Sequence, residues 1–297
     1  MGEIADADGH PTPVSLPNSE QFYLKNDQGK KYLIQISWPL LWEDREKPRS
    51  CPIIYLVDGN SMFVTATESS WRRGYSSRFN SGIIVAIGYP LEGKLYDIER
   101  RNLDLTPPSE TSVPGHGKAD DFLDFFQKSV KPAVRSRFPK ISFEREALFG
   151  HSYGGLFALH GLFTRPGYFD CFMASSPSIW WNDRCILNEA ERFLNETSLA
   201  DEKVPSVMFF WGALEQNPPR WDNESDEDYD TRKQTALGFR MGDNALDLIL
   251  KLEDSTRVRV LSKDEYEGEE HLSIVPCSVS RALTKFFEEW PLKKSES

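Results

Sequence analysis

Long apolar runs are missing from this sequence of 297 residues. No stretch approaches the ~20 consecutive apolar residues that a membrane-spanning helix needs. The first 20 residues, MGEIADADGHPTPVSLPNSE, are acidic and polar, and they lack both the basic start and the apolar centre of a secretory signal. We therefore expect a cytoplasmic protein that does not bind a membrane.

Positive charge is also scarce. The chain has 35 Lys and Arg against 46 Asp and Glu, which gives a formal net charge of -11. Nucleic-acid binding rewards clustered Lys and Arg, so this balance argues against a nucleic-acid partner. It is typical of an acidic cytoplasmic enzyme.

Cysteine is rare, and no group of residues has the spacing of metal ligands. The cysteines lie far apart and form no C-x-x-C pair; they are Cys51, Cys171, Cys185 and Cys277. In a chain without a secretory signal, such cysteines are typically reduced packing residues. The acidic run at 223–230 (NESDEDYD) is interpreted as a solvated loop, not a metal site. We expect no resident metal or cofactor.

The order of apolar segments predicts an α/β fold. Two segments flank Asn-Asp-Gln-Gly and predict an antiparallel β-hairpin; they are Gln21–Lys25 and Lys31–Trp38. Apolar runs of strand length then recur, mostly without the alternation of a half-exposed strand; they are Pro52–Val57, Gly82–Ile87, Ala147–Phe149, Cys171–Ala174, Val204–Trp211 and the alternating Arg257–Leu261. Helical spacing lies between or after them, over 120–138, where Pro132 should interrupt the helix, and over 231–252 and 275–290.

Strands that alternate with helices predict a mostly parallel, doubly wound sheet led by an antiparallel N-terminal hairpin. Residues 1–19 contain three prolines and are expected to form a loosely held arm. Residues 20–292 contain no repeat and no linker, and we expect them to form a single domain.

One short motif carries chemistry. Residues 146–159 read EALFGHSYGGLFAL, and Gly150-His151-Ser152-Tyr153-Gly154 fits the G-x-S-x-G nucleophile elbow. In that motif a strand ends and a helix begins within a few residues, with the serine in an unfavourable backbone conformation at the apex. The apolar flanks agree with a strand, a turn and a helix. We interpret Ser152 as a nucleophile; the alternative is a small-residue turn without catalytic function.

A serine nucleophile needs a base, and in proteins with this elbow the chain order is serine, acid, histidine. That order excludes most of the histidines. His10 and His116 precede the serine, His160 lies on the elbow helix, and His151 is expected to have a structural role. His271 remains, in the segment YEGEEH between the last strand and the last helix, and is the predicted base. The alternative is a surface histidine that caps the final helix.

The acid that orients the base is harder to assign. Glu215 lies in Gly-Ala-Leu-Glu directly after the apolar run 204–211, and it is the first candidate. Asp243 and Asp254 also lie between serine and histidine, but Asp243 is embedded in a helical stretch and Asp254 precedes the last strand. A Ser–His pair without an acid is a further alternative.

An oxyanion hole requires two backbone N–H groups that point at the developing negative charge. One is expected from Tyr153, the residue after the nucleophile. The second is expected from Gly59 or Asn60, in the Asp-Gly-Asn segment that follows the run 52–57. A plain strand-to-helix turn is the alternative for that segment.

Several motifs in order resemble a known family. They are IIYLVDGNSMF, IERRNLDLTP, GHGKADDFLDFF, LFGHSYGGLFALHGLF, SSPSIWW and GEEHLSI, and they extend over residues 50–275. Together they resemble the putative esterase family of α/β-hydrolases, and within it the siderophore esterases of the trilactone and fusarinine type. The resemblance implies an α/β-hydrolase fold and a serine esterase that hydrolyses ester bonds of a ferric siderophore inside the cell. Any iron would then arrive with the substrate.

The resemblance also implies roles for individual residues. Ser152 matches the family's nucleophile and His271 its base, whereas Glu215 falls where the family has an acidic residue in a loosely defined segment. Arg101 and Asp104 match positions associated with the substrate cleft. Arg101 either holds a polar group of the substrate or pairs with Asp104 to shape its loop.

Two adjacent tryptophans, Trp180 and Trp181, also match cleft positions of this family. Adjacent indoles after a strand are unusual as pure core, because each N–H requires a partner. We expect them to form a wall for a bulky substrate.

Other functions share this fold and motif. A general carboxylesterase, a thioesterase or an acyltransferase acting on a biosynthetic lactone or thioester would use the same residues. A hydrolase-fold binding protein without catalysis is an alternative of a different class. The substrate's identity, the oligomeric state and the role of the loop at 216–230 are not specified by these motifs.

Overall fold

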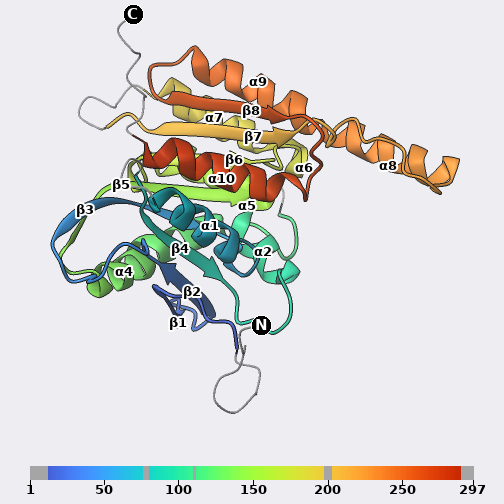
Figure 1. The fold of residues 1–297 in the computed structure, drawn as a ribbon. Coiled ribbons are helices and arrows are strands. Elements are labelled where there is room, and N and C mark those ends of the chain that lie inside the picture. Colours follow the sequence, from blue (N-terminus) through green and yellow to red (C-terminus); the bar gives the residue numbers. More distant parts are fainter. Residues whose placement is uncertain (1–12, 76–79, 110–111, 197–202, 289–297) are drawn as a thin grey trace, which may run out of the picture.

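The computed structural model describes residues 13–75, 80–109, 112–196 and 203–288. One mixed sheet of eight strands runs through these segments in the order β1-β2-β4-β3-β5-β6-β7-β8 (Figure 1). The strands are β1 (Ser19–Lys25), β2 (Lys31–Ser37), β3 (Arg49–Leu56), β4 (Ile83–Gly88), β5 (Ile141–His151), β6 (Cys171–Ser175), β7 (Ser206–Gly212) and β8 (Arg259–Tyr266).

Each predicted strand overlaps an observed one, although β5 begins earlier than predicted and β8 extends five residues beyond Leu261. β1 pairs with β2, and β2 with β4, in antiparallel fashion. All other pairs are parallel; they are β4–β3, β3–β5, β5–β6, β6–β7 and β7–β8. Gly29 in the hairpin turn has φ 76°, a conformation that glycine adopts without steric cost. The predicted doubly wound α/β fold is therefore confirmed.

Helices cover both faces of the sheet. They are α1 (Gly59–Gly74), α2 (Ile98–Leu105), α3 (Ala119–Phe125), the π-turn η1 (Phe126–Val130), α4 (Lys131–Arg137), α5 (Tyr153–Thr164), the 3₁₀ turn η2 (Pro166–Tyr168), α6 (Trp181–Arg184), α7 (Ile186–Asn195), α8 (Asp226–Phe239), α9 (Met241–Glu253) and α10 (Ile274–Phe287). α1 and α10 lie side by side on the face toward the viewer in Figure 1, and α5, α7 and α9 lie behind the sheet.

The core consists of two apolar layers, one on each face of the sheet. Ile54 and Leu56 of β3 pack with α1 and α10, while Ile53 and Tyr55 of the same strand pack with α3, α5 and α7. Successive side chains of a strand point to opposite faces, so a strand covered on both faces must be apolar at every position. This explains why the central strands of the sequence show no alternation.

Two predicted helical segments are divided in the structure. The helix expected over 120–138 is interrupted by the π-turn η1, directly before Pro132, whose nitrogen has no proton to donate. The helical stretch at 231–252 contains two helices, α8 and α9, separated by Arg240 in the left-handed conformation with φ 48°.

The sequence predicted a loop for the acidic run at 223–230, but the structure contains a loop only in its first part. Its second half forms the first turn of α8, where Ser225 caps the helix by accepting a hydrogen bond from the Asp228 backbone N–H at 3.1 Å. Acidic side chains are favourable at this end because the helix dipole is positive there. α8 itself buries no residue and projects from the body at the right of Figure 1.

Within the described segments, no helix is long and apolar enough to cross a membrane. The four cysteines are unpaired, as predicted, and Cys51 and Cys171 are buried. Most of the predicted arm, residues 1–12, lies outside the described residues, and β1 begins at Ser19. The division into an arm and a single domain over 20–292 stays a prediction.

Candidate active site

Ser152 lies at a sharp turn between β5 and α5. Its backbone has φ 60° and ψ -118°, a strained combination for a residue with a side chain. The Ser152 N–H donates a hydrogen bond to the Ser175 carbonyl at the end of β6, at 2.9 Å. Any side chain at Gly150 would collide with the backbone of Gly154. The glycines of the motif therefore permit the close approach of strand and helix that holds the serine at the apex.

His271 and Glu215 come together although 56 residues separate them. His271 follows β8, Glu215 follows β7, and the two strands are parallel neighbours, so their carboxyl ends share one edge of the sheet. The His271 Nδ1 lies 2.6 Å from the Glu215 Oε2. The acid first considered from sequence is thus the one that contacts the histidine, whereas Asp243 lies on α9 and pairs with Arg240.

The Glu215 carboxylate has a second set of partners. Its Oε1 accepts hydrogen bonds from the Ser176 hydroxyl and from the Gly212 N–H, each at 2.6 Å. The Glu215 side chain is 1% exposed, and that of His271 is 38% exposed. A buried carboxylate that is fixed by two donors holds its other oxygen in place for the histidine.

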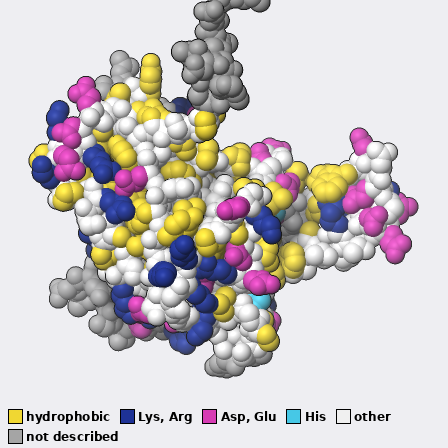
Figure 2. All heavy atoms as spheres, turned by 90° about the horizontal axis from the view of Figure 1, so that it is seen from below, with side chains coloured by type: hydrophobic (Ala, Val, Ile, Leu, Met, Phe, Trp, Pro, Cys, Tyr) yellow, Lys and Arg dark blue, Asp and Glu magenta, His cyan; other side chains and the backbone are white. Residues whose placement is uncertain are grey.

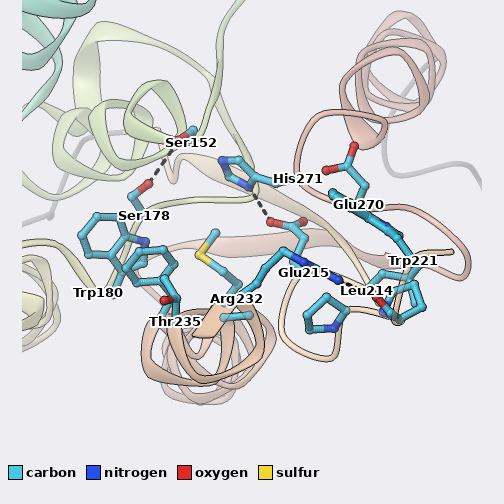
Figure 3. A pocket seen from close by; sticks show the side chains of 15 residues that line it. Ser152, Ser178, Trp180, Leu214, Glu215, Trp221, Arg232, Thr235, Glu270 and His271 are labelled. Atoms are coloured by element: carbon cyan, nitrogen blue, oxygen red, sulfur yellow. Dashed lines mark hydrogen bonds and ion pairs between the residues drawn. The ribbon is translucent and has the colours of Figure 1, made fainter. Parts of the chain in front are cut away.

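The Ser152 hydroxyl makes its hydrogen bond with a neighbouring serine. Its Oγ lies 3.3 Å from the Ser178 Oγ, and the Ser178 N–H donates to the Ser152 carbonyl at 3.2 Å. Figure 3 shows the imidazole of His271 between Ser152 and Glu215. The hydrogen bond of the Ser152 hydroxyl is thus to Ser178 and not to His271, and contacts between a nucleophile and its base are often long before a substrate binds.

The residues expected to form an oxyanion hole lie at two helix beginnings. Tyr153 is the first residue of α5, and Gly59 and Asn60 are the first residues of α1. The first N–H groups of a helix have no partner within it and carry its positive dipole end. The beginnings of α5 and α1 lie close together. A Cβ added at Gly154, the second residue of α5, would be 2.8 Å from the side chain of Val57, which lies two residues before α1.

The loop that carries Gly59 is held from several sides. A Cβ at Gly59 would approach the backbone carbonyl carbons of Ala86 and Ile87 to 2.9 Å, so only glycine fits. The Asn60 side chain accepts from the Tyr89 N–H at 2.7 Å and donates to the Tyr89 carbonyl at 3.0 Å. These contacts fix the first turn of α1 against the end of β4.

A pocket of about 420 Å³ opens beside Ser152 and His271. Its walls are mostly apolar and come from the segment after β7, from α8 and from Trp180; the lining residues are Ser152, Ser178, Trp180, Leu214, Glu215, Pro218, Pro219, Trp221, Arg232, Thr235, Ala236, Phe239, Met241, Glu270 and His271. Figure 3 shows the serine and the histidine on one side of the cavity and Thr235 and Arg232 on another. The segment at 216–230, whose role the sequence did not specify, thus supplies part of the pocket wall.

α8 contacts the body of the protein through Phe239, and the segment that precedes α8 through Arg232. The Phe239 ring stacks on Trp180 with centroids 4.3 Å apart and planes at 18°. The Arg232 guanidinium donates to Glu224 at 2.7 and 2.8 Å and lies over the Trp221 ring at 4.2 Å. Figure 2 shows α8 standing away from the rest of the molecule, with acidic side chains at its outer end.

Only one of the two adjacent tryptophans lines the pocket. Trp180 is partly exposed and forms a wall, while Trp181 is 5% exposed and stacks on His116 with centroids 5.9 Å apart. Trp181 therefore packs behind the wall. The two side chains point in different directions because Trp180 and Trp181 have helical backbone conformation, in which successive side chains are turned by about 100° around the axis.

Arg101 and Asp104 are not among the pocket-lining residues, and they do not pair with each other. The segment is the helix α2, and Arg101 forms a two-pronged ion pair with Asp58, with Nε and Nη2 at 3.1 and 3.0 Å from its oxygens. The Asp104 carboxylate is buried and accepts from the Tyr32 hydroxyl at 2.9 Å. Burial opposes the charge of Arg101, but the Asp58 carboxylate raises its pKa above the usual value.

Sequence reasoning did not identify Ser176, Ser178, Arg232, Thr235 or Phe239. The two serines follow β6, where the run SSPS could have suggested hydroxyl groups near a strand end. The α8 residues had no such signal, since this helix has no buried face. Within the described segments, no group of three His, Cys, Asp or Glu could hold a metal ion.

Comparisons with known proteins agree with this geometry. A family model described as "Putative esterase" matches residues 26–247. The chain belongs to this family of α/β-hydrolases. A solved structure titled "Siderophore hydrolase EstB from Aspergillus nidulans" superposes with a TM-score of 0.91 and 53% identity, covering 97% of this chain and 100% of that one.

Two relatives in this esterase family align over nearly the whole chain. A protein of Aspergillus fumigatus named "Siderophore triacetylfusarinine C esterase" is 60% identical over 287 residues, which is 96% of this chain and 98% of that protein. A protein of Emericella nidulans named "Siderophore enterobactin esterase" is 43% identical over 286 residues, 91% of this chain and 94% of that protein. The resemblance seen in the sequence motifs is confirmed.

Proposed function

We propose that this esterase-family protein is a serine esterase that opens the ester bonds of a ferric siderophore of the fusarinine type. The observation that carries the catalytic part is the contact between the buried Glu215 carboxylate and His271 Nδ1 at 2.6 Å, in the pocket that also contains Ser152. Along the chain the proposed nucleophile Ser152 comes first, the acid Glu215 second and the base His271 third, and all three lie at one edge of the sheet.

In the proposed acylation step, His271 accepts the proton of the Ser152 hydroxyl through Nε2. The Nδ1–H of His271 donates a hydrogen bond to the Glu215 carboxylate, which fixes the tautomer and leaves the Nε2 lone pair available. The serine oxygen attacks the ester carbonyl, and the imidazolium then donates its proton to the leaving alcohol. The buried carboxylate stabilises the imidazolium while it exists.

The proposed oxyanion donors are the Tyr153 N–H and the N–H of Gly59 or Asn60. They belong to two adjacent helix beginnings that are fixed before the substrate arrives, so little reorganisation is needed when charge develops on the carbonyl oxygen. In deacylation a water molecule replaces the alcohol, His271 removes its proton, and the acid product is released from Ser152.

The substrate class rests on the pocket and on the relatives. Trp180, Pro218, Pro219 and Phe239 offer broad apolar surfaces, which suit a bulky ligand with few charges. Three hydroxamate groups neutralise Fe³⁺, whereas three catecholates leave a trianion. A chain with net charge -11 and a carboxylate, Glu270, at the pocket is better matched to the neutral complex. The 60% identical relative is named for triacetylfusarinine C, a substrate of this kind.

We place this reaction inside the cell, with a small-molecule ester as the partner and with iron as part of the substrate. Of the residues that the sequence assigned to substrate binding, Trp180 contacts the substrate in this proposal. Arg101 lies behind Trp180, since Arg101 and Trp180 both contact the Tyr153 ring, while Trp181 packs on His116 and Asp104 on Tyr32. Hydrolysis of the esters would divide a hexadentate chelator into weaker fragments and so allow the iron to leave.

The function is tested with purified protein and four substrates, followed by mass spectrometry. They are a ferric fusarinine-type triester, its iron-free form, a ferric catecholate trilactone and a p-nitrophenyl ester. We expect the fusarinine triester to be opened fastest, and Ser152→Ala to remove this activity. Fastest turnover of the trilactone would overturn the substrate class, and fast turnover of the simple ester alone would indicate a general carboxylesterase.

A serine-directed phosphonate provides the matched control for catalysis. Wild-type protein should be labelled once, and Ser152→Ala should not be labelled. Absence of labelling and of turnover in wild type would favour a hydrolase-fold binding protein and would overturn the proposed mechanism.

A further inference from the structure

His151 lies directly before the nucleophile, and the mechanism above does not use it. It is the last residue of β5 and is 3% exposed. Its ring packs against that of His271, with centroids 4.6 Å apart and planes at 44°. Two imidazoles from elements 120 positions apart in the chain therefore meet beneath the pocket, and one of them is the proposed base.

The backbone near the proposed base is held, since the Leu214 N–H donates to the Glu269 carbonyl at 3.0 Å, but its side chain extends from a largely exposed turn. His271 is in the turn after β8, where the neighbouring Glu267, Gly268 and Leu272 are exposed. Glu215 holds one edge of the His271 ring through Nδ1. One hydrogen bond fixes the position of Nδ1, but the ring can still rotate about that contact.

We propose that His151 is a positioning residue for His271, and that its buried ring supports the base on the face that Glu215 leaves free. β5 then fixes both reacting groups, because Ser152 follows His151 directly. The distance from serine to histidine is thereby set by one strand end instead of by the exposed turn after β8. This inference rests on the proposed function, because it assigns His271 as the base.

The chemistry requires that the supporting ring stays uncharged. Burial lowers the pKa of His151 well below the usual value, and the neighbouring His271 and Arg101 lower it further, although a hydrogen bond to the His271 backbone acts in the opposite direction. The charged groups that face this pair are Arg101 from α2, paired with Asp58, and Glu215 from the segment after β7. A cation at His151 would repel the imidazolium that forms on His271 during acylation.

The test uses His151→Asn, which loses the supporting ring, and His151→Phe, which keeps a ring at this position. Turnover of a p-nitrophenyl ester by His151→Asn should fall by about 10- to 100-fold in kcat, because a misplaced catalytic group costs this much, while His151→Phe should retain most of the wild-type kcat. KM should stay within about twofold, because His151 does not contact the substrate. His160→Gln is the matched control, since His160 is also a buried histidine but lies away from the pocket; it should lower Tm and leave kcat unchanged.

A double variant separates positioning from general damage. In the His271→Ala background, the added His151→Asn change should not reduce the residual rate further, because the proposed effect acts through His271. A further loss of the same size would mean that His151 supports the elbow or the oxyanion hole, and it would overturn the proposal. So would a His151→Asn kcat near the wild-type value, once phosphonate labelling has shown that Ser152 of the wild-type protein is active.

Discussion

The replacement Glu215→Gln tests the proposed catalytic geometry with almost no change in shape. The Glu215 Oε1 must accept from two donors, the Ser176 hydroxyl and the Gly212 N–H, each at 2.6 Å. An amide oxygen can take this position, but an amide NH₂ cannot. The glutamine would therefore orient its oxygen toward these donors and its NH₂ toward His271.

The consequence is a wrong tautomer of the base. The amide NH₂ would donate to the His271 Nδ1, so that the remaining ring proton sits on Nε2, where the serine proton should be accepted. The variant also lacks the negative charge that stabilises the imidazolium. A triad with this defect typically loses about 10³- to 10⁴-fold in kcat, or ~4 to 5.5 kcal/mol of transition-state stabilisation.

The assay is steady-state hydrolysis of a p-nitrophenyl ester, with Tm as the control for folding. KM should change little, because the apolar walls of the pocket are untouched. Glu215→Asp serves as the second variant, since it keeps the charge but shortens the reach to His271. If Glu215→Gln retained more than about a tenth of the wild-type kcat, Glu215 would not be the orienting acid, and the Ser–His pair would work without one.

Three further predictions concern the pocket, the oxyanion hole and a buried histidine. Phe239→Ala removes the ring that stacks on Trp180 at 4.3 Å and should raise KM for the bulky siderophore about tenfold while leaving KM for a p-nitrophenyl ester unchanged; equal effects on both would argue against α8 as a substrate wall. Gly59→Ala places a Cβ 2.9 Å from backbone atoms of β4 and should lower kcat by about 10²-fold or more, with a lower Tm; a fully active variant would exclude this turn from the oxyanion hole. His160 is 1% exposed and contacts Glu189 at 2.8 Å, and hydrogen bonds to Asp120 and Glu189 outweigh burial and raise its pKa to about 9. Since this pKa is raised on folding, its contribution to stability is complete below the unfolded value of about 6.5 and is lost as the pH rises through about 9, so a thermal-unfolding series should show Tm falling over that window in wild type but not in His160→Gln.

The fold and the strained turn at Ser152 could be predicted because their signals are local. Fully apolar strands, a turn with glycine and a serine between two glycines each report the conformation of the residues that carry them. Chain order then selected His271 among the histidines, because parallel strands bring their carboxyl ends to one edge. The same logic gave Glu215 as the first candidate, but it could not exclude Asp243 or Asp254, since order along the chain does not specify which side chain reaches the histidine.

Two groupings based on nearness in sequence differ from the contacts in the structure. Arg101 was considered as a partner of Asp104, yet the helix α2 directs Arg101 to Asp58 on another element, at 3.0 Å. Trp181 was grouped with Trp180, yet only Trp180 lines the pocket, because successive residues of a helix point about 100° apart; the role of both at the substrate stays a prediction. Nearness in the chain predicts contacts only where the backbone conformation between two residues is known.

By itself, the sequence determined the class of fold, the strained serine and the type of chemistry, because periodicity and glycine placement act within a few residues. Only the tertiary structure decided which carboxylate holds His271, which ring lies beneath it and which helix forms the far wall of the pocket. α8 is the clearest case, since it buries no residue and is placed by the stacking of Phe239 on Trp180 and by the ion pair of Arg232. Such contacts join segments whose separation in space is set by the order of strands in the sheet, and no local pattern encodes that order.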